Sequence, residues 1–358
     1  QGYYSFAINQ SNPDVVWMGV YGKGMFVSYD AMEYDMFANG LDNKMMGKKI
    51  TRVVINPQNA SEVYVASEEG VFKTGDNGQH WEEMNDGLET LDIRSLKIAS
   101  IEWPPFEDSF DDGNADGWRS GGGWSVVKEN DNYVYQGIGH EWTEAGSQLW
   151  GDYTFEVKVK LIQGGVHVNF RKNDEGRYFL GLNEGGLYLR RQFNHWTQFA
   201  DLTSSAQHLN LGQWYNLRIE LNGDRIKVSV NGILRIDYVD SEPLLNGAIA
   251  FESLPDSRVY VDDVSVKINP SFAVYAGTGG YGVYRLDLAN KKWQNLGRTF
   301  GTGWWTPWER RMYQFSSILF DPITPGRVYL GHFPSGFFIS DNNGHTWKDS
   351  SLGLGNDG

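Results

Sequence analysis

The eight residues Thr74-Gly75-Asp76-Asn77-Gly78-Gln79-His80-Trp81 return near the end of the chain as Ser340-Asp341-Asn342-Asn343-Gly344-His345-Thr346-Trp347. Both copies place a hydroxyl first, Asp or Asn third, Gly fifth and Trp eighth. This pattern predicts a tight turn between antiparallel strands, because the polar side chains bind backbone N–H groups and Gly adopts a positive φ. The Trp is expected to pack into the core. We therefore expect a scaffold role for Thr74, Asp76, Gly78, Trp81, Ser340, Asn342, Gly344 and Trp347.

The segments around these turns repeat as well. An aromatic residue precedes the first hydroxyl by 11, 10 and 11 residues in three places, at the pairs 17 and 28, 64 and 74, and 329 and 340. The first two copies are 64 − 17 = 47 residues apart, which suits a four-stranded propeller blade. A third copy opens at residues 93–98 and resumes only at 273, so it contains an insertion after its first strand. A fourth copy spans 315–354.

The eight-residue turn resembles the Asp-box of sialidase-type β-propellers, and the second copy also resembles the propeller repeats of xyloglucanases. Without an insert at 106–268, the chain has 358 − 163 = 195 residues, enough for about four blades of 47 residues. Propellers of this kind usually have six or more blades. The resemblance therefore implies further blades, either from sequence beyond Gly358 or from a partner chain. A closed four-blade ring is the less favoured alternative. The chain also begins with Gln1 rather than Met, which favours a trimmed or partial protein.

The insert has a different sequence texture. Residues 153–161 and 225–230 alternate apolar and polar side chains, and Asn-Gly turns follow at 222–223 and 231–232. This alternation predicts an antiparallel sandwich. The segments 106–110, 213–219 and 259–266 resemble a laminin-G-like or concanavalin-A-like jelly roll. The predicted fold is therefore all-β, with a partial β-propeller in residues 1–105 and 269–358 and an inserted antiparallel β-sandwich in residues 106–268.

The jelly-roll resemblance implies a structural calcium site. In such folds the first and last strands lie side by side, and an acidic residue from each end often holds Ca²⁺. Here Glu107 or Asp108 would meet Asp262 or Asp263, and carboxylate oxygens are ligands that Ca²⁺ prefers. The alternative is that these residues are solvated edge charges that prevent strand-to-strand aggregation.

Two aromatic patches are candidate saccharide sites. Residues 301–311 carry three Trp within a long connection, and flat indole rings suit the apolar faces of sugars while charged neighbours bind hydroxyls. We expect Trp304, Trp305, Trp308 and Glu309 to contribute, although this loop could instead pack against the insert, a blade or another subunit. The second patch, at 188–196, includes Arg190 and Trp196. Alternate strand residues face opposite sides, so at best half of this patch shares one site.

Composition excludes several classes of partner and site. The chain has 31 basic and 45 acidic side chains, a formal charge of 31 − 45 = −14, so nucleic acid and anionic membranes are poor partners. The sequence has no run of 18 apolar residues that would predict a membrane span. Zero Cys excludes disulfides, thiolate metal sites and a Cys nucleophile.

The sequence leaves open whether the chain is an enzyme. The arginine triad of sialidases cannot be assigned, and no phosphate-binding loop is present. Hydrolysis by paired carboxylates could involve Asp30, Asp35 or Glu309, but their spacing singles out none of them. The favoured hypothesis is a secreted or cell-surface protein that binds a polysaccharide or other glycan. The alternatives are a polysaccharide-degrading glycoside hydrolase with its carboxylates in the propeller cleft, and a structural or assembly protein of the cell surface.

Overall fold

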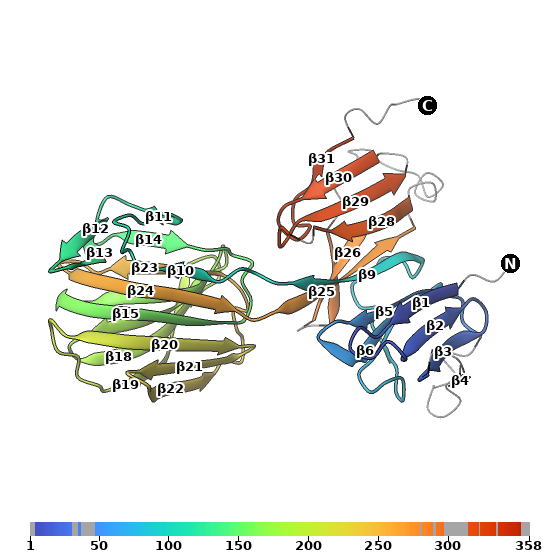
Figure 1. The fold of residues 1–358 in the computed structure, drawn as a ribbon, viewed down its shortest axis with the longest axis horizontal. Coiled ribbons are helices and arrows are strands. Elements are labelled where there is room, and N and C mark those ends of the chain that lie inside the picture. The colour runs from blue at the N-terminus through green and yellow to red at the C-terminus, as the bar shows by residue number, and fades with distance from the viewer. Residues whose placement is uncertain are drawn as a thin grey trace. The chain divides into compact units, whose positions relative to one another are not determined.

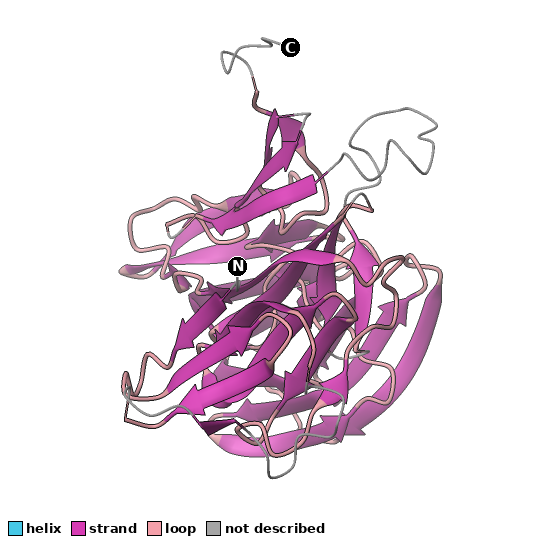
Figure 2. Cartoon of the chain, turned by 90° about the vertical axis from the view of Figure 1, so that its right-hand side faces the viewer, coloured by secondary structure: helices cyan, strands magenta, loops and turns pink. Residues whose placement is uncertain are grey.

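The described residues of this protein form β-strands as their only regular structure (Figures 1 and 2). The computed structural model describes residues 4–30, 35–36, 47–279, 281–288, 291–296, 314–321, 323–333 and 336–351. Within these ranges there is no helix, and hence none long and apolar enough to cross a membrane. The chain divides into two compact units. Unit 1 comprises Gln1–Ile101 and Pro270–Gly358, and unit 2 comprises Glu102–Asn269.

The described residues of unit 1 form four antiparallel sheets of four strands each. The first sheet contains β1 (Tyr4–Ile8), β2 (Val16–Val20), β3 (Gly24–Ser28) and β4 (Asp35–Met36). The second contains β5 (Ile50–Asn56), β6 (Asn59–Ser67), β7 (Gly70–Thr74) and β8 (Glu82–Glu83). The third contains β9 (Ile93–Ile101), β25 (Ser271–Thr278), β26 (Val283–Asp287) and β27 (Lys292–Asn295). The fourth contains β28 (Gln314–Phe320), β29 (Val328–Phe333), β30 (Gly336–Ser340) and β31 (Lys348–Asp349).

The strand order explains the repeat in the sequence. Each sheet is a meander of neighbouring strands, and the third sheet takes β9 from before unit 2 and its other three strands from after it. Apolar clusters lie between successive sheets: one joins Trp17 to Val65 and Trp81, and another joins Tyr64 to Trp293. Each sheet is open, and the described residues form no closed ring. The repeated four-stranded sheet is therefore observed, whereas a complete propeller is not.

The first repeated turn has the hydrogen bonds expected from its sequence. The Thr74 hydroxyl accepts a bond from the N–H of Gly78 (2.9 Å) and donates to the Asp76 carboxylate (2.8 Å). Asp76 also accepts the N–H of His80 (2.9 Å), and Gly78 has a φ of 87°. Trp81 is buried between the first two sheets.

The second turn repeats this geometry. The Ser340 hydroxyl accepts the N–H of Gly344 (2.8 Å) and donates to Asn342 Oδ1 (2.9 Å). Asn342 in turn accepts the N–H of Thr346 (2.8 Å), and Gly344 has a φ of 86°. Trp347 donates its indole N–H to a backbone carbonyl oxygen (3.0 Å). In both copies, the hydroxyl and the carboxylate or carboxamide thus accept backbone N–H groups of the turn, and the Gly has a positive φ.

Removing the Ser340 hydroxyl tests this assignment. Ser340→Ala is expected to lower the free energy of unfolding by about 1–3 kcal/mol, because the buried N–H of Gly344 loses its acceptor. Chemical unfolding followed by Trp fluorescence measures the change. Ser350→Ala, an exposed position just beyond the same sheet, is the control and should have little effect. Equal losses in the two variants would contradict the assigned role.

Unit 2 contains two antiparallel sheets. The eight-stranded sheet contains β12 (Trp124–Glu129), β13 (Asn132–Ile138), β24 (Arg258–Ile268), β15 (Tyr153–Gln163), β20 (Trp214–Asn222), β21 (Arg225–Val230) and β22 (Ile233–Val239), and β10 (Phe106–Asp108) pairs with β24. The seven-stranded sheet contains β11 (Trp118–Ser120), β14 (Trp142–Ala145), β23 (Ala248–Ser253), β16 (Val166–Lys172), β17 (Arg177–Asn183), β18 (Gly186–Phe193) and β19 (Gln198–Ser205).

The core of unit 2 lies between these two sheets. Alternate residues of β15, such as Phe155 and Val157, share one apolar cluster with Val166, Val168 and Phe170 of β16. The antiparallel sandwich predicted from the alternation is confirmed. The intervening residues of the seven-stranded sheet point away from this core and form what we call the outer face, since successive strand side chains face opposite sides.

Candidate functional site

One row of residues crosses the outer face in register. Trp142 on β14 pairs with Glu252 on β23, and Glu252 pairs with His167 on β16. His167 in turn pairs with Gly181 on β17, and Gly181 pairs with Tyr188 on β18. Neighbouring strands lie about 4.8 Å apart, so the row spans about 19 Å. The sheet therefore brings five residues that are distant in sequence onto one surface.

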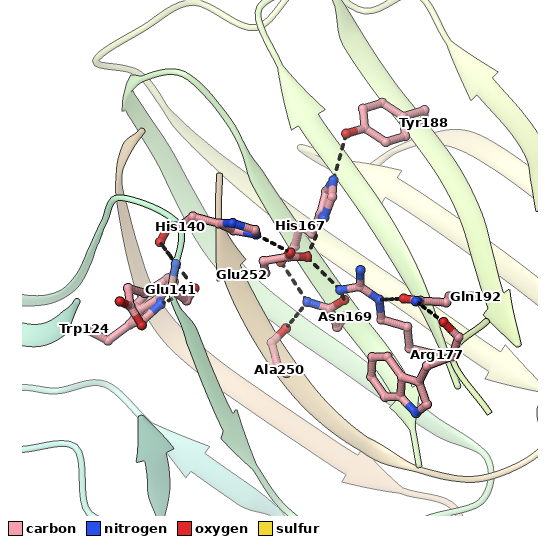
Figure 3. A network of polar contacts seen from close by, with 12 residues as sticks. Trp124, His140, Glu141, His167, Asn169, Arg177, Tyr188, Gln192, Ala250 and Glu252 are labelled. Atoms are coloured by element: carbon pink, nitrogen blue, oxygen red, sulfur yellow. Dashed lines mark hydrogen bonds and ion pairs between the residues drawn. The ribbon is translucent and has the colours of Figure 1, made fainter. Parts of the chain in front are cut away.

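Glu252 lies at the centre of a polar network (Figure 3). Its Oε2 atom contacts His167 Nδ1 (2.6 Å) and Arg177 Nη1 (2.7 Å), and its Oε1 contacts His140 Nε2 (3.0 Å). Its residue exposure is only 5%. Burial alone would raise the pKa of Glu252, but the hydrogen bond from His167 and the charge of Arg177 outweigh it and lower the pKa to about 2. The carboxylate is therefore ionised at neutral pH.

His167 connects this carboxylate to a phenol. An ionised carboxylate only accepts hydrogen bonds, so Nδ1 of His167 carries a hydrogen. In the neutral form of the ring, Nε2 is then the acceptor for the Tyr188 hydroxyl, 2.8 Å away. Burial raises the pKa of Tyr188, so its hydroxyl stays protonated at neutral pH. A carboxylate, an imidazole and a hydroxyl in this order form an arrangement that can move a proton.

Gly181 makes room for the Tyr188 ring. A Cβ atom at Gly181 would lie 2.0 Å from Cζ of Tyr188, and the other close atoms also belong to that ring. The ring thus lies over β17 and places its hydroxyl beside His167. A larger residue at position 181 would force the ring away.

Arg177 anchors the aromatic side chains next to the network. Its guanidinium lies 4.5 Å from the ring centroids of Trp142 and Phe179 and 5.6 Å from that of Trp196. It also donates to Asn169 Oδ1 (2.7 Å). Cation–π contacts with a desolvated guanidinium stabilise this stack.

An open pocket of about 450 Å³ lies beside this stack. The rings of Trp142 and Trp196 meet edge to face with centroids 6.3 Å apart. Glu144 forms ion pairs with Arg119 and Lys172, and the Lys172 ammonium lies 5.2 Å from the Trp196 ring centroid. We call this the Trp pocket; its lining residues are Arg119, Gly121, Trp142, Glu144, Lys172 and Trp196. Aromatic faces beside a few charged groups are suited to a polar ligand with apolar patches, such as a sugar.

A second open pocket, of about 290 Å³, lies between β18 and β19. Tyr188, Arg190 and Asp201 line it together with Thr203 and Ser204. Arg190 forms an ion pair with Asp201, and its guanidinium lies 5.1 Å from the Tyr188 ring centroid. Tyr188 therefore belongs both to the polar network and to a space that a ligand can enter.

The structure places Arg190 and Trp196 in different pockets. Arg190 lines the second pocket, and Trp196 lines the Trp pocket. The strand alternation does not extend to Trp196, because β18 ends at Phe193 and Trp196 lies in the following turn with a φ of 69°. That turn directs Trp196 back over Arg177. The glycan-binding roles of Arg190 and Trp196 stay predictions.

Other candidates from the sequence have not been placed in a site. Trp304, Trp305, Trp308 and Glu309 lie outside the described residues. Asp30 is exposed and accepts a hydrogen bond from the Ser28 hydroxyl (3.0 Å), while the Asp35 side chain is not among those described.

The proposed calcium ligands each have protein partners. Asp108 accepts bonds from the Trp118 indole (2.9 Å) and a backbone N–H, and Asp262 accepts one from Asn132 (2.9 Å). Asp263 forms an ion pair with Lys158. β10 does pair with β24, as the jelly-roll resemblance implied. Among the described residues no group of three or more His, Asp or Glu could hold a metal ion, and the calcium site stays a prediction.

Sequence reasoning missed most of the network. The missed residues share no local motif, because they come from different strands: His140, Trp142, His167, Arg177, Gly181 and Glu252. One signal was available. His167 and Asn169 alternate with Val166, Val168 and Phe170, so polar side chains on an apolar strand marked a polar outer face.

Residues 105–267 match the model of one protein family, described as the 3-keto-alpha-glucoside-1,2-lyase-like domain. No curated protein sequence matches the chain. Similar solved structures include the carbohydrate-binding module CBM66 from Bacillus subtilis, with 17% identity, a TM-score of 0.36, and 42% of this chain and 95% of that chain covered. Another is domain 4 of AbnA, a GH43 extracellular arabinanase from Geobacillus stearothermophilus, solved with arabinotriose (14% identity, TM-score 0.36, 49% and 94% covered). A third is a Bacillus subtilis protein of unknown function with a galectin-like fold (13% identity, TM-score 0.38, 48% and 98% covered).

Proposed function

We propose that unit 2 binds a glycan on its outer face, with the Trp pocket as the platform. The observation that carries this proposal is the Trp142–Trp196 pair, which lines an open pocket beside the ion-paired Glu144, Lys172 and Arg119. Indole rings can pack on the apolar face of a sugar ring, and the charged groups can bind its hydroxyls. The family match over residues 105–267 supports a carbohydrate ligand.

The wider setting belongs to the same proposal. Unit 1 would be part of an Asp-box propeller completed by further blades, and the protein would act outside the cell or at its surface. The loop with Trp304, Trp305, Trp308 and Glu309 would supply a further glycan contact. A structural Ca²⁺ at Asp108, Asp262 and Asp263 would be detected as a loss of thermal stability in the presence of chelator.

Truncating either Trp tests the platform. Trp142→Ala and Trp196→Ala are each expected to weaken glycan binding about 10-fold to 100-fold, since a buried aromatic anchor contributes about 1–3 kcal/mol. A glycan array identifies the ligand, and calorimetry with the full chain measures the dissociation constants. Trp214→Ala on the eight-stranded sheet is the matched control and should bind as wild type does. Unchanged binding in both pocket variants would reject the platform.

A second candidate function is the elimination after which the matching family is named. The specific observation in its favour is the His167 ring held between Glu252 and Tyr188 on the same face as the Trp pocket. In a 3-keto-glucoside the hydrogen on C2 is acidic because it lies next to the C3 carbonyl, so a positioned base can remove it. Hydrolysis by carboxylates in unit 1 and an assembly role are the remaining alternatives. Shortening of a polysaccharide without a conjugated product would favour hydrolysis. The absence of both glycan binding and turnover would favour the assembly role.

A further inference from the structure

We infer that Tyr188 and His167 form a proton relay that carries both proton transfers of a 1,2-elimination, with Glu252 and Gly181 as positioning residues. The inference rests on the proposed function, because it requires a sugar bound on the outer face. The inference goes beyond the proposed function by naming the groups that move the proton.

The relay is built before any ligand binds. The Tyr188 hydroxyl lies 2.8 Å from His167 Nε2, to which it donates when the ring is neutral, and His167 Nδ1 contacts Glu252 Oε2 (2.6 Å). The phenol oxygen keeps its lone pairs for a ligand, while the imidazole can accept the phenol proton. A second anchor fixes the carboxylate, since Arg177 binds the same Oε2 atom (2.7 Å).

The balanced step is as follows. The Tyr188 oxygen takes the proton from C2 of a 3-keto-β-glucoside, whose C2 hydrogen and C1 oxygen lie on one face, while its own hydroxyl proton moves to His167 Nε2. The C2–H electron pair forms the C1=C2 bond, and the C1–O bond breaks with its electron pair going to the leaving oxygen. Tyr188 then gives a proton to that oxygen and recovers one from His167. The products are an alcohol and a conjugated 3-keto-1,2-ene, the relay ends unchanged, and no oxidant or reductant is needed.

The carboxylate of Glu252 favours a transient positive charge on His167. The imidazole contacts Glu252 from β23 and Tyr188 from β18, while Arg177 and His140 contact the carboxylate of Glu252. The Phe179 ring packs against the imidazole with centroids 4.4 Å apart. The negative charge of Glu252 stabilises the imidazolium that forms, as in hydroxyl–imidazole–carboxylate triads.

Space for the substrate lies next to the phenol. Tyr188 lines the pocket of about 290 Å³ between β18 and β19, and the register row connects it across Gly181, His167 and Glu252 to Trp142 of the Trp pocket. A sugar ring bound at Tyr188 can therefore extend its leaving group along the outer face toward the Trp pocket.

Two variants separate the relay from binding. Tyr188→Phe removes the phenol oxygen but keeps the ring, and it is expected to lower kcat about 10²-fold to 10⁴-fold with KM nearly unchanged. Gly181→Ala keeps every relay group but displaces the ring from His167, so it should lower kcat in the same direction. Tyr133→Phe on β13 of the other sheet is the matched control and should behave as wild type.

The assay uses the full chain and 4-nitrophenyl 3-keto-β-glucoside, in which the C2 hydrogen and the C1 oxygen lie on the same face of the sugar ring. Nitrophenol release and ultraviolet absorbance of the enone measure turnover, exchange of the C2 hydrogen in D₂O is followed by NMR, and calorimetry measures binding. Wild type should exchange C2–H. Tyr188→Phe should lose this exchange while calorimetry shows unchanged binding, a combination that a purely structural role would not produce.

The outcomes distinguish the relay from the proposed function. Binding that Trp142→Ala abolishes, without exchange or turnover in wild type, overturns the relay and leaves glycan binding intact. Turnover in Tyr188→Phe within twofold of wild type also overturns the relay. No binding by wild type to this probe or to any arrayed glycan overturns both proposals. If Tyr188→Phe does not fold, Gly181→Ala decides the relay by the same exchange and turnover measurements.

Discussion

Replacing Glu252 with alanine is expected to lower the free energy of unfolding by about 3–5 kcal/mol. The carboxylate holds two imidazoles and the guanidinium of Arg177, and it is almost fully buried. Its removal leaves Arg177 in a desolvated position without its ion pair. Denaturant unfolding followed by circular dichroism measures the loss. Glu156→Ala, which breaks an exposed pair with Arg218 on the other sheet, should cost no more than about 1 kcal/mol.

The same residue predicts a pH dependence with a defined sign. The pKa of Glu252 is lowered from 4.5 to about 2, so its contribution is fully present above about pH 4.5 and is lost as the pH falls through about 2. A shift of this size corresponds to about 3 kcal/mol. Glu252→Gln removes the titrating group, so its stability curve should be flatter than that of wild type across this window. Parallel curves for the two proteins between pH 4.5 and 2 would contradict the assignment.

Local patterns predicted the parts of the fold that local chemistry determines. The turns at Thr74 and Ser340 follow from a hydroxyl, an Asp or Asn and a Gly at fixed spacing, and the hydrogen bonds are all within five residues. The alternation in residues 153–161 likewise reports which side chains of β15 enter the core. Neither pattern fixes how sheets are arranged in space, which is why a blade-like repeat did not establish a ring.

The site could not be predicted because its contacts are between distant strands. Glu252 lies 85 residues from His167 and 75 from Arg177, and only the register of the seven-stranded sheet brings them together. Gly181 matters because its cross-strand neighbour is Tyr188, which no local spacing reveals. The aromatic residues at 188–196 made Trp196 a candidate in the sequence. The direction of its side chain depends on a turn with positive φ, which the strand pattern did not indicate.

Breaking the buried ion pair between Arg171 and Asp152 should lower the free energy of unfolding as much as replacing Glu252 with alanine. Arg171 is 0% exposed, and its guanidinium donates to Asp152 Oδ1 (2.6 Å) and to the carbonyl oxygens of Gly223 (2.6 Å) and Leu244 (2.8 Å). Asp152→Ala leaves the cation buried without its carboxylate and removes the acceptor for the Gly223 N–H (2.9 Å). We expect a loss of about 3–5 kcal/mol in the free energy of unfolding. Asp237→Ala, which breaks the solvent-facing pair with Arg225, is the control and should change the unfolding midpoint little.

The double variant separates a missing charge from a missing contact. Arg171→Met alone leaves two buried carbonyl oxygens without a donor and so should also destabilise the protein. In the combined Asp152→Ala and Arg171→Met variant no buried charge is left unpaired, so the total loss should be smaller than the sum of the two single losses by about 1–3 kcal/mol. Losses that add fully would mean that the pair is not coupled. In that case Arg171 would stabilise unit 2 through its carbonyl contacts, because those contacts join the β20–β21 turn to the segment before β23 without the carboxylate.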